Sequence, residues 1–187
     1  MIAVHHNADV NTEVQNAKVE TVENGDGKEG DGEIFLNDIW CLYFHDPHDS
    51  DWTFKSYKLI GTLSSVESFW ITHELLHDKW CHGMFFLMRE HVFPCWDDVN
   101  NKDGGCLSMK MTKAELNSFW QHLSIRLLGE CLSTNTNIME NINGISISPK
   151  KHSCIIKIWL KTNDFTSPTL FDIPANYNGE CLYKNNM

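Results

Sequence analysis

Residues 84–98 read Met-Phe-Phe-Leu-Met-Arg-Glu-His-Val-Phe-Pro-Cys-Trp-Asp-Asp. The apolar run at 84–88 predicts a strand that is buried on both faces, and the polar residues and Pro94 end it. Trp96 and Asp97 then fall on a loop. A Trp beside an acid can offer a π-face and a carboxylate to one electron-poor ring with N–H donors, such as a cationic guanine. The alternative is a Trp that covers the sheet edge and an Asp that starts a turn.

Composition narrows the class of protein. The chain has 187 residues, of which 42% are hydrophobic and 11% aromatic, and this predicts one globular domain. Residues 1–33 contain eight acids and two lysines and read as a disordered acidic tail, which leaves residues 34–187 as the folded domain. That domain is only mildly acidic. This charge argues against a basic surface for duplex nucleic acid, and any nucleic-acid contact should be small and local.

The cysteines and the first residues of the chain indicate the cellular compartment in which the protein is expected. Seven cysteines without a C-x-x-C pair argue against a disulfide framework and a four-thiolate zinc site, and they favour a reducing environment. The first residues lack the basic start and apolar core of a signal peptide, and no apolar run approaches a membrane span. We expect a soluble cytoplasmic protein without membrane contact, with the nucleus as a further compartment.

Alternating patterns predict an antiparallel sheet. Strands are expected at residues 39–44, 54–63, 84–89, 107–111 and 155–160. Residues 100–105 read as a hairpin turn whose return strand is 107–111, and Asn143-Gly144 marks another turn. Beyond the last strand, Pro168 and Pro174 leave room for little more than one helical turn.

Two helices are predicted between these strands. Ser64-x-x-Glu67 and Thr112-x-x-Glu115 are capping boxes. Apolar stripes follow at helical spacing. They comprise Val66, Phe69, Trp70, His73 and Leu76 or His77 in the first helix, and Leu116, Phe119, Trp120, Leu123 and Leu127, ending at Gly129, in the second. The short turns favour an α+β fold with the helices on one face of the sheet.

One motif suggests an enzyme. His73-Glu74-Leu75-Leu76-His77 spells H-E-x-x-H on a predicted helix, the arrangement of zinc proteases. A third ligand at a recognisable spacing is not evident downstream, and aromatic residues precede the helix. We therefore expect packed or solvent-facing histidines, with no bound metal and no catalytic residues.

The ordered series of tryptophans resembles the eukaryotic translation initiation factor 4E family, the messenger-RNA cap-binding proteins. The resemblance spans residues 36 to about 161. The phrases that carry it are Trp40-x-x-Tyr43-Phe44, Val66-Glu-Ser-Phe-Trp70, Phe93-Pro-Cys-Trp-Asp-Asp98 followed by Asn101-Lys-Asp-Gly-Gly105, Phe119-Trp120 with Leu128-Gly-Glu130, and Ile156-Lys-Ile-Trp159.

The resemblance implies a curved antiparallel sheet with helices on its convex face and the cap on its concave face. Trp52 and Trp96 are then expected to sandwich 7-methylguanine, and Asp97 to accept hydrogen bonds from its N1 and N2 groups. Trp159 is expected to line the methyl group, with sheet packing as the alternative. No cofactor is implied.

For the cap phosphates, Lys150 matches a basic position of the family, with Lys151 beside it. Ile155 replaces a phosphate-binding lysine. Because side chains alternate along a strand, Lys157 and Lys161 should share the face of Trp159, and Lys157 is expected to replace that lysine in part. The family's longer C-terminal helix and closing loop are not evident after Lys161, so residues 162–187 form a divergent segment.

On the opposite, dorsal side, Trp70 matches the exposed Trp on which scaffold or repressor proteins dock a Tyr-x-x-x-x-Leu-hydrophobic helix. Leu36, Val66 and Ile125 are expected to complete this surface, and the alternative makes Trp70 a core residue. The partner would be a scaffold resembling initiation factor 4G or a repressor, and the chain itself a monomer.

These inferences together describe a non-enzymatic cap-binding protein that acts in translation initiation. Three alternatives remain open: a repressor-type relative that binds cap without recruiting the scaffold, a family fold that serves only as an interaction module, and a metalloenzyme.

Overall fold

The computed structural model describes residues 32–186, so the predicted tail lies almost wholly outside the described residues. In chain order the described residues form β1 (Phe35–His45), β2 (Lys58–Ser65), α2 (Val66–Leu76), β3 (Met84–Arg89), β4 (Gly105–Met111), α3 (Leu116–Leu128), α4 (Thr136–Glu140), β5 (Ile142–Pro149), β6 (Cys154–Leu160), the 3₁₀ turn η1 (Pro168–Leu170) and β7 (Cys181–Asn185). Within residues 32–186, no helix combines the length and the hydrophobicity that crossing a bilayer requires.

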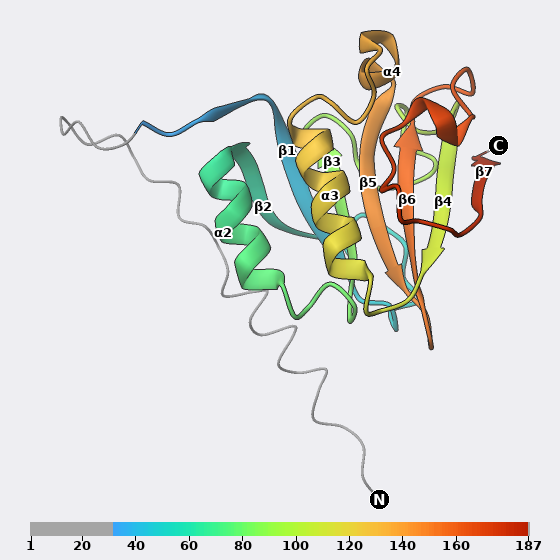
Figure 1. Cartoon of the computed structure of the whole chain (residues 1–187). Coiled ribbons are helices and arrows are strands. Elements are labelled where there is room, and N and C mark those ends of the chain that lie inside the picture. The colour runs from blue at the N-terminus through green and yellow to red at the C-terminus, as the bar shows by residue number, and fades with distance from the viewer. Residues whose placement is uncertain (1–31, 187) are drawn as a thin grey trace, which may run out of the picture.

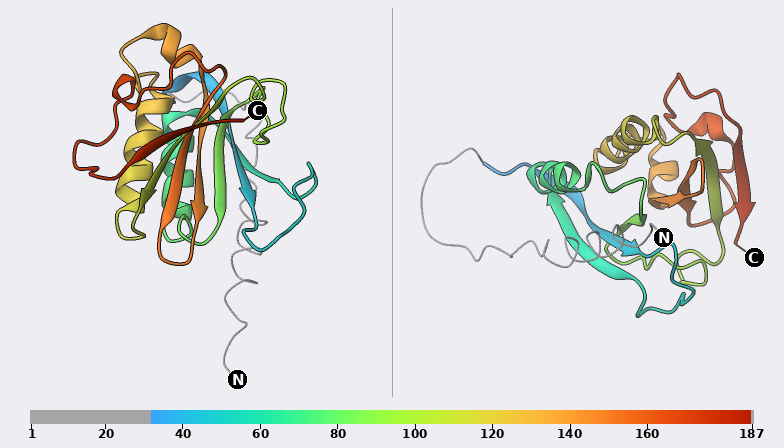
Figure 2. Two further views of the ribbon diagram at one scale, coloured as in Figure 1. Left: turned by 90° about the vertical axis from the view of Figure 1, so that its right-hand side faces the viewer. Right: turned by 90° about the horizontal axis from the view of Figure 1, so that it is seen from below.

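All of these strands join one antiparallel sheet, in the order β2-β1-β3-β5-β6-β4-β7. The sheet is curved, and α2 and α3 lie side by side on one of its faces (Figures 1 and 2). The predicted α+β fold with helices on one face is confirmed. The opposite face is left for the loops that follow β1 and β3.

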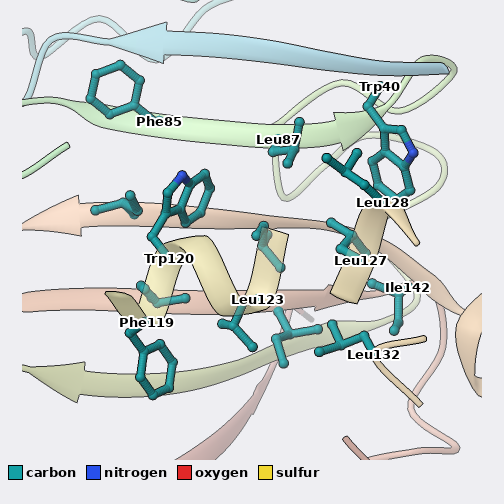
Figure 3. Packing of buried hydrophobic residues seen from close by; sticks show 14 of the residues in the cluster. Trp40, Phe85, Leu87, Phe119, Trp120, Leu123, Leu127, Leu128, Leu132 and Ile142 are labelled. Atoms are coloured by element: carbon teal, nitrogen blue, oxygen red, sulfur yellow. The ribbon is translucent and has the colours of Figure 1, made fainter. Parts of the chain in front are cut away.

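The main core lies between the sheet and α3. Every residue of the stripe predicted for this helix is buried: Leu116, Phe119, Trp120, Leu123 and Leu127. Figure 3 shows side chains of α3 packed over Phe85 and Leu87 of β3. Burial of a large apolar side chain contributes about 1.5–3 kcal/mol, so this helix is held by its packing rather than by its intrinsic propensity.

The two faces of β6 differ, as strand alternation predicts. Ile156, Ile158 and Leu160 are fully buried in the core under the helices. Trp159 instead joins a smaller apolar cluster on the other face. The direction predicted for Trp159 is therefore correct.

A buried cation joins several segments at one end of the sheet. Arg89, at the end of β3, forms ion pairs with Asp38 of β1 and with Glu130, whose Oε2 is 3.1 Å from Nη2. It also donates to the carbonyls of Ile142 (2.9 Å) and Met139 (3.2 Å). Glu130 follows α3 with φ 51°, in the left-handed region that residues other than glycine adopt uncommonly, and its N–H donates to the carbonyl of Leu127 at 3.1 Å.

The predicted hairpin at residues 100–105 is wrong. These residues do turn, but β4 does not pair with β3; it pairs with β6 and β7, while β3 pairs with β1 and β5. The local turn residues were read correctly, but a turn signal does not identify the strand that follows as a neighbour.

The turn predicted at Asn143-Gly144 is also wrong, because both residues lie within β5. The register between β5 and β6 shifts there, between Ile142 and Gly144. A Cβ on Gly144 would lie 2.3 Å from the carbonyl oxygen of Leu87. Glycine is thus required for close approach of two strands and not for a turn.

The first capping box forms one residue later than predicted. The Ser65 hydroxyl accepts from the Ser68 N–H (3.1 Å), and the Ser68 hydroxyl lies 3.1 Å from the Ser65 N–H that donates to it. Glu67 instead accepts from the N–H of Ile34 (3.1 Å). Thr112 and Glu115 form the reciprocal hydrogen bonds predicted for the second box, at 3.1 and 3.3 Å, but these close the turn before α3, whose N-cap is Glu115 without a side-chain cap.

Two strands begin elsewhere than predicted, and the first of them begins at Phe35 rather than at residue 39. The second strand begins at Lys58 rather than at residue 54, because residues 54–57 belong to the preceding loop. The short turn expected near Pro168 is present as η1. Sequence patterns predicted neither β5, where a turn was expected, nor β7, whose five residues alternate little and gain their structure by pairing with β4.

Candidate functional site

A small apolar cluster lies on the face of the sheet away from the helices. Its buried members are Phe86, Met88, Val92, Cys106 and Trp159, with Tyr43, Tyr57 and Met84 packed around them. Burial raises the pKa of Tyr43 and that of Cys106 to about 12, so both groups are neutral near pH 7. The cluster forms an uncharged aromatic floor.

Two loops rise on this side of the sheet. The loop after β1 and the loop after β3 both lie on the face opposite α2 and α3 (Figure 2). They meet where Phe54 of the first loop packs on Phe93 of the second, with ring centroids 4.2 Å apart. Tyr57 packs edge-on against the same Phe93 ring at 5.1 Å. Sequence reasoning did not identify this contact, which joins the two loops that carry the predicted tryptophans.

Trp52 lies on the first loop and is 51% exposed. One face of its indole stacks on the buried His45 ring, with centroids 4.2 Å apart and planes 7° from parallel. The Nε2 of His45 lies 2.8 Å from the carbonyl oxygen of Asp51 and fixes the ring orientation. The stack leaves the other face of the indole open to a ligand.

Trp96 and Asp97 project from the second loop, where Trp96 is 62% exposed. The thiol of Cys95 donates to Oδ1 of Asp97 at 2.6 Å. Burial, and next the hydrogen bond to Asp97, raise the pKa of the Cys95 thiol, so it stays protonated and remains a donor. The carboxylate of Asp97 is therefore oriented by its own neighbour before any ligand arrives.

Buried asparagines hold the backbone of this second loop. Asn101 is fully buried, and its Nδ2 donates to the carbonyls of Phe93 (2.9 Å) and Cys95 (2.8 Å). Asn143 of β5 donates to Asn101 Oδ1 (2.9 Å) and to the carbonyl of Asn100 (2.6 Å). These residues were read as turn formers, and only their burial reveals that they position the segment before Trp96.

Trp159 lies in the floor rather than in the open site. It is 6% exposed, and its Nε1 donates to the hydroxyl of Ser146 on β5 at 2.9 Å. The ring of Phe86 is 6.3 Å away at an angle of 60°. Its position on the concave face agrees with the predicted direction, and its burial agrees with the sheet-packing alternative.

The predicted basic residues are spread along the same side. Lys157 of β6 is half-buried, and its Nζ lies 5.9 Å from the centroid of the Trp159 ring. Lys150 and Lys151 are exposed in the turn between β5 and β6, where the N–H of Lys150 donates to the carbonyl of Ser153 (2.8 Å). Lys161 is exposed just beyond β6. The structure thus brings Lys157, and not the other lysines, to the aromatic floor.

The predicted dorsal residues lie on the helical side. Trp70 of α2 and Ile125 of α3 are each 42% exposed, whereas Phe69, which precedes Trp70 on α2, is buried. Val66 is half-buried, and Leu36 packs partly against the core. The alternative that Trp70 is a core residue is wrong.

The two histidines of the H-E-x-x-H motif lie in different environments. His73 is buried, its Nε2 has no hydrogen-bond partner, and burial followed by the proximity of His77 lowers its pKa. His77 is exposed, with Nδ1 3.0 Å from Asp78 Oδ1 and Nε2 3.3 Å from Asn117 Nδ2. Among residues 32–186, no three His, Cys, Asp or Glu side chains are grouped so as to hold a metal ion.

Comparisons with known proteins agree on one family. The family described as "Eukaryotic initiation factor 4E" matches residues 35–175. Over 137 residues the chain is 27% identical to "Eukaryotic translation initiation factor 4E-1A" of Danio rerio, a match that covers 70% of this chain and 61% of the relative. Over 137 residues it is 26% identical to the "Eukaryotic translation initiation factor 4E homolog" of Acanthamoeba polyphaga mimivirus, covering 62% of this chain and 50% of that relative. The chain therefore spans less than two thirds of either relative.

Solved structures show the same fold. Ascaris suum eIF4E-3 with m7G cap superposes with a TM-score of 0.62 at 21% identity, covering 71% of this chain and 76% of that chain. Schistosome eIF4E complexed with m7GpppA and 4E-BP gives a TM-score of 0.65 at 18% identity, covering 72% of this chain and 75% of that chain. C. elegans eIF4E-3 with the 4E-binding protein Mextli and cap analog gives a TM-score of 0.62 at 20% identity, covering 70% of this chain and 76% of that chain.

Proposed function

Because this chain belongs to the eukaryotic initiation factor 4E family, we propose that it binds the 7-methylguanosine 5′ cap of messenger RNA and acts in translation initiation. The observation that carries the proposal is the pair of exposed tryptophans, Trp52 and Trp96, on two loops that meet above an apolar floor. The solved relatives with bound m7G caps give independent support.

The methylated base suits this pair because methylation makes guanine cationic. A cation between two indoles gains cation–π energy that an unmethylated guanine cannot provide, and each base–aromatic stack contributes about 1–3 kcal/mol. In the proposed complex, Trp52 uses the indole face that His45 leaves open, and Trp96 closes the other side of the base.

Asp97 supplies the acceptor for the edge of the guanine. An ionised carboxylate has about four lone-pair sites, so it can accept from the N1–H and N2–H groups while the Cys95 thiol remains bonded to Oδ1. An inosine cap analogue lacks the N2 amino group and would lose one of these bonds. We propose that Asp97 supplies the selectivity for guanine and the tryptophans the selectivity for methylation.

The triphosphate is assigned to lysines on the same side. Lys157 is the best placed, because its Nζ already lies over the Trp159 ring. Lys150 and Lys151, in the β5–β6 turn, are proposed to meet the more distant phosphates. A lysine contact with phosphate is a point-charge interaction that should weaken as salt increases.

The first prediction concerns methyl selectivity. We expect 7-methyl-GTP to bind at least tenfold more tightly than GTP, because the cation–π gain is about 1–2 kcal/mol in a desolvated stack. Quenching of tryptophan fluorescence on titration measures both affinities. Trp52→Ala and Trp96→Ala should each remove most of the difference, and equal affinities of the wild type for the two nucleotides would contradict the proposal.

The phosphate assignment is tested in the same titration with 7-methylguanosine as the second ligand. Lys157→Ala should lower the affinity for 7-methyl-GTP about fivefold, on the order of 1 kcal/mol for one contact. The affinity for 7-methylguanosine should not change. Lys113→Ala is a control, since this exposed lysine lies in the turn before α3. Unchanged affinity for both ligands in Lys157→Ala would remove this residue from the phosphate site.

We further propose that the dorsal surface binds an amphipathic helix of a scaffold or repressor protein. Trp70 and Ile125 expose apolar area on adjacent helices, and Val66 and Leu36 extend it at half-buried positions. Solved relatives bound to 4E-BP and to Mextli support a partner of this kind. If partner binding persists without selectivity for methylated guanine, the chain acts as an interaction module instead.

A further inference from the structure

The C-terminal strand is connected to the loop that carries Trp96 and Asp97. Strand β7 pairs with β4 from Met109↔Cys181 to Gly105↔Asn185, which brings the end of β7 to the start of β4. The views in Figure 2 show this end beside the loop between β3 and β4. The contact is between segments separated by about half of the chain.

Asn186 makes the connection with two hydrogen bonds. Its backbone N–H donates to the carbonyl of Gly104 at 3.0 Å, and its Nδ2 donates to the carbonyl of Asn101 at 2.8 Å. Asn101 is the fully buried residue whose own amide donates to the carbonyls of Phe93 and Cys95. A continuous path of amide–carbonyl bonds therefore runs from Asn186 to the backbone immediately before Trp96.

A second connection supports the first. The hydroxyl of Tyr183 on β7 donates to Asn163 Oδ1, and Asn163 Nδ2 donates to the carbonyl of Asp103 at 2.9 Å. Tyr183 also covers Gly105, where a Cβ would lie 2.4 Å from its hydroxyl oxygen. Asn186 thus holds the loop at Asn101 and Gly104, and Tyr183 of β7 supports it at Asp103 through Asn163.

Such bonds matter because the loop has no regular secondary structure of its own between β3 and β4. A binding loop that is ordered before the ligand arrives avoids part of the entropic cost of binding. Bonds to buried carbonyls are also costly to lose, since the acceptor stays away from water.

We propose that β7 and Asn186 form a clasp that preorganises the Trp96–Asp97 loop, with Asn186 and Asn101 as positioning residues for the base site. The clasp deepens the proposed function and rests on it. The end of the chain then contributes to base binding without touching the base. Loss of the clasp should weaken nucleoside and nucleotide alike, unlike loss of a phosphate lysine.

The test compares Asn186→Ala and Asn186→Asp with the wild type. Asp has the same size as Asn, but its carboxylate cannot donate to the Asn101 carbonyl. In both variants we expect amide hydrogen exchange at Cys95, Asp98 and Lys102 to become about two- to tenfold faster. Affinities for 7-methylguanosine and 7-methyl-GTP should fall together by a similar factor, and exchange in the core strands should not change.

Asn178→Ala is the matched control, since Asn178 is an exposed asparagine shortly before β7. It should leave both exchange and affinity unchanged. Unaltered loop exchange in the Asn186 variants would refute the clasp, and faster exchange with unaltered affinity would refute its positioning role. A wild type without preference for 7-methyl-GTP would refute the proposed function and the positioning role together, while the exchange data would still decide whether Asn186 holds the loop.

Discussion

Arg89 shows how one side chain can join distant segments. Its guanidinium pairs with Asp38 and Glu130 and donates to two carbonyls, and it also lies 4.7 Å from the centroid of the Trp40 ring. Removal of one partner from a buried ion pair leaves an uncompensated charge, which typically costs about 3–5 kcal/mol. The side chain of Arg89 is 11% exposed, but those of Glu130 and Asp38 are 22% and 34% exposed, so the lower end of this range applies.

We therefore expect Arg89→Met to lower the free energy of unfolding by about 3 kcal/mol, measured by urea denaturation. Adding Glu130→Gln should recover part of this loss, because the stranded carboxylate is then neutral. If the double variant is no more stable than the single one, the Glu130 charge is not the source of the cost.

For single residues, the sequence predicts the face of the sheet to which a side chain points better than it predicts how deeply the side chain is buried. Strand alternation gave the face of Trp159 correctly, but its depth in the floor and its bond to Ser146 depend on a neighbouring strand. Asn101 was read as a turn residue because its partners Asn143 and Asn186 lie 42 and 85 residues away. Polar residues that act through distant contacts leave no local pattern.

Among the elements, α2 presents the proposed partner surface. We expect Trp70→Ala to weaken binding of a Tyr-x-x-x-x-Leu-hydrophobic peptide by about 2 kcal/mol or more, roughly thirtyfold, because an exposed aromatic anchor dominates such interfaces. Fluorescence anisotropy of the labelled peptide measures the change.

Ile71→Ala is the comparison for this prediction. Ile71 is 58% exposed on the same helix, but it lies about 100° around the axis from Trp70. It should retain peptide binding. Trp70→Ala should also keep the unfolding midpoint and the cap affinity of the wild type; loss of these together with peptide binding would show that the substitution disturbs the fold rather than a docking contact.

The helices also show why the type of an element was predicted better than the residues at which it begins and ends. The first capping box moved by one residue because Ser64 and Ser65 both offer a hydroxyl, and Glu67 is used by the N–H of Ile34. That competing bond comes from a segment more than 30 residues earlier, which local spacing cannot show. In α3 the predicted stripe was correct, but Thr112 and Glu115 bond to each other in the turn before the helix rather than at its N-cap.

For the molecule as a whole, the buried His73 links stability to pH. It packs between Phe69, Trp80 and the exposed His77, with Nε2 unpartnered. Its pKa is lowered below the ordinary value of about 6.5, so between these two values the unfolded chain binds more protons than the folded one. Stability contributed by the neutral imidazole is therefore present above pH 6.5 and is lost as the pH falls.

We expect the free energy of unfolding to decrease between pH 7.5 and 5.5, with His73 contributing at most about 1.4 kcal/mol per pH unit. Urea denaturation at several pH values measures the slope. His73→Leu should make the slope shallower, whereas His152→Ala, at an exposed position in the turn between β5 and β6, should not. Identical slopes in His73→Leu and the wild type would assign the pH dependence to other groups.

The overall architecture was accessible from the sequence only in part. Local patterns predicted strands and two helices on one face, and the tryptophan series supplied the curvature and the faces of the sheet. The neighbours of β4 and the existence of β5 and β7 were not predicted, because these strands pair with segments that are far apart in the chain.

The order of the strands also has a consequence for synthesis on the ribosome. The first three strands are neighbours in the sheet and can pair as soon as each is made. Strand β4 bonds only to β6 and β7, so its apolar residues Leu107 and Met109 have no strand to join until Leu160 has left the exit tunnel. At roughly 5–20 residues per second this delay lasts several seconds. The nascent chain therefore carries an unpaired hydrophobic strand for longer than any other part of its sheet.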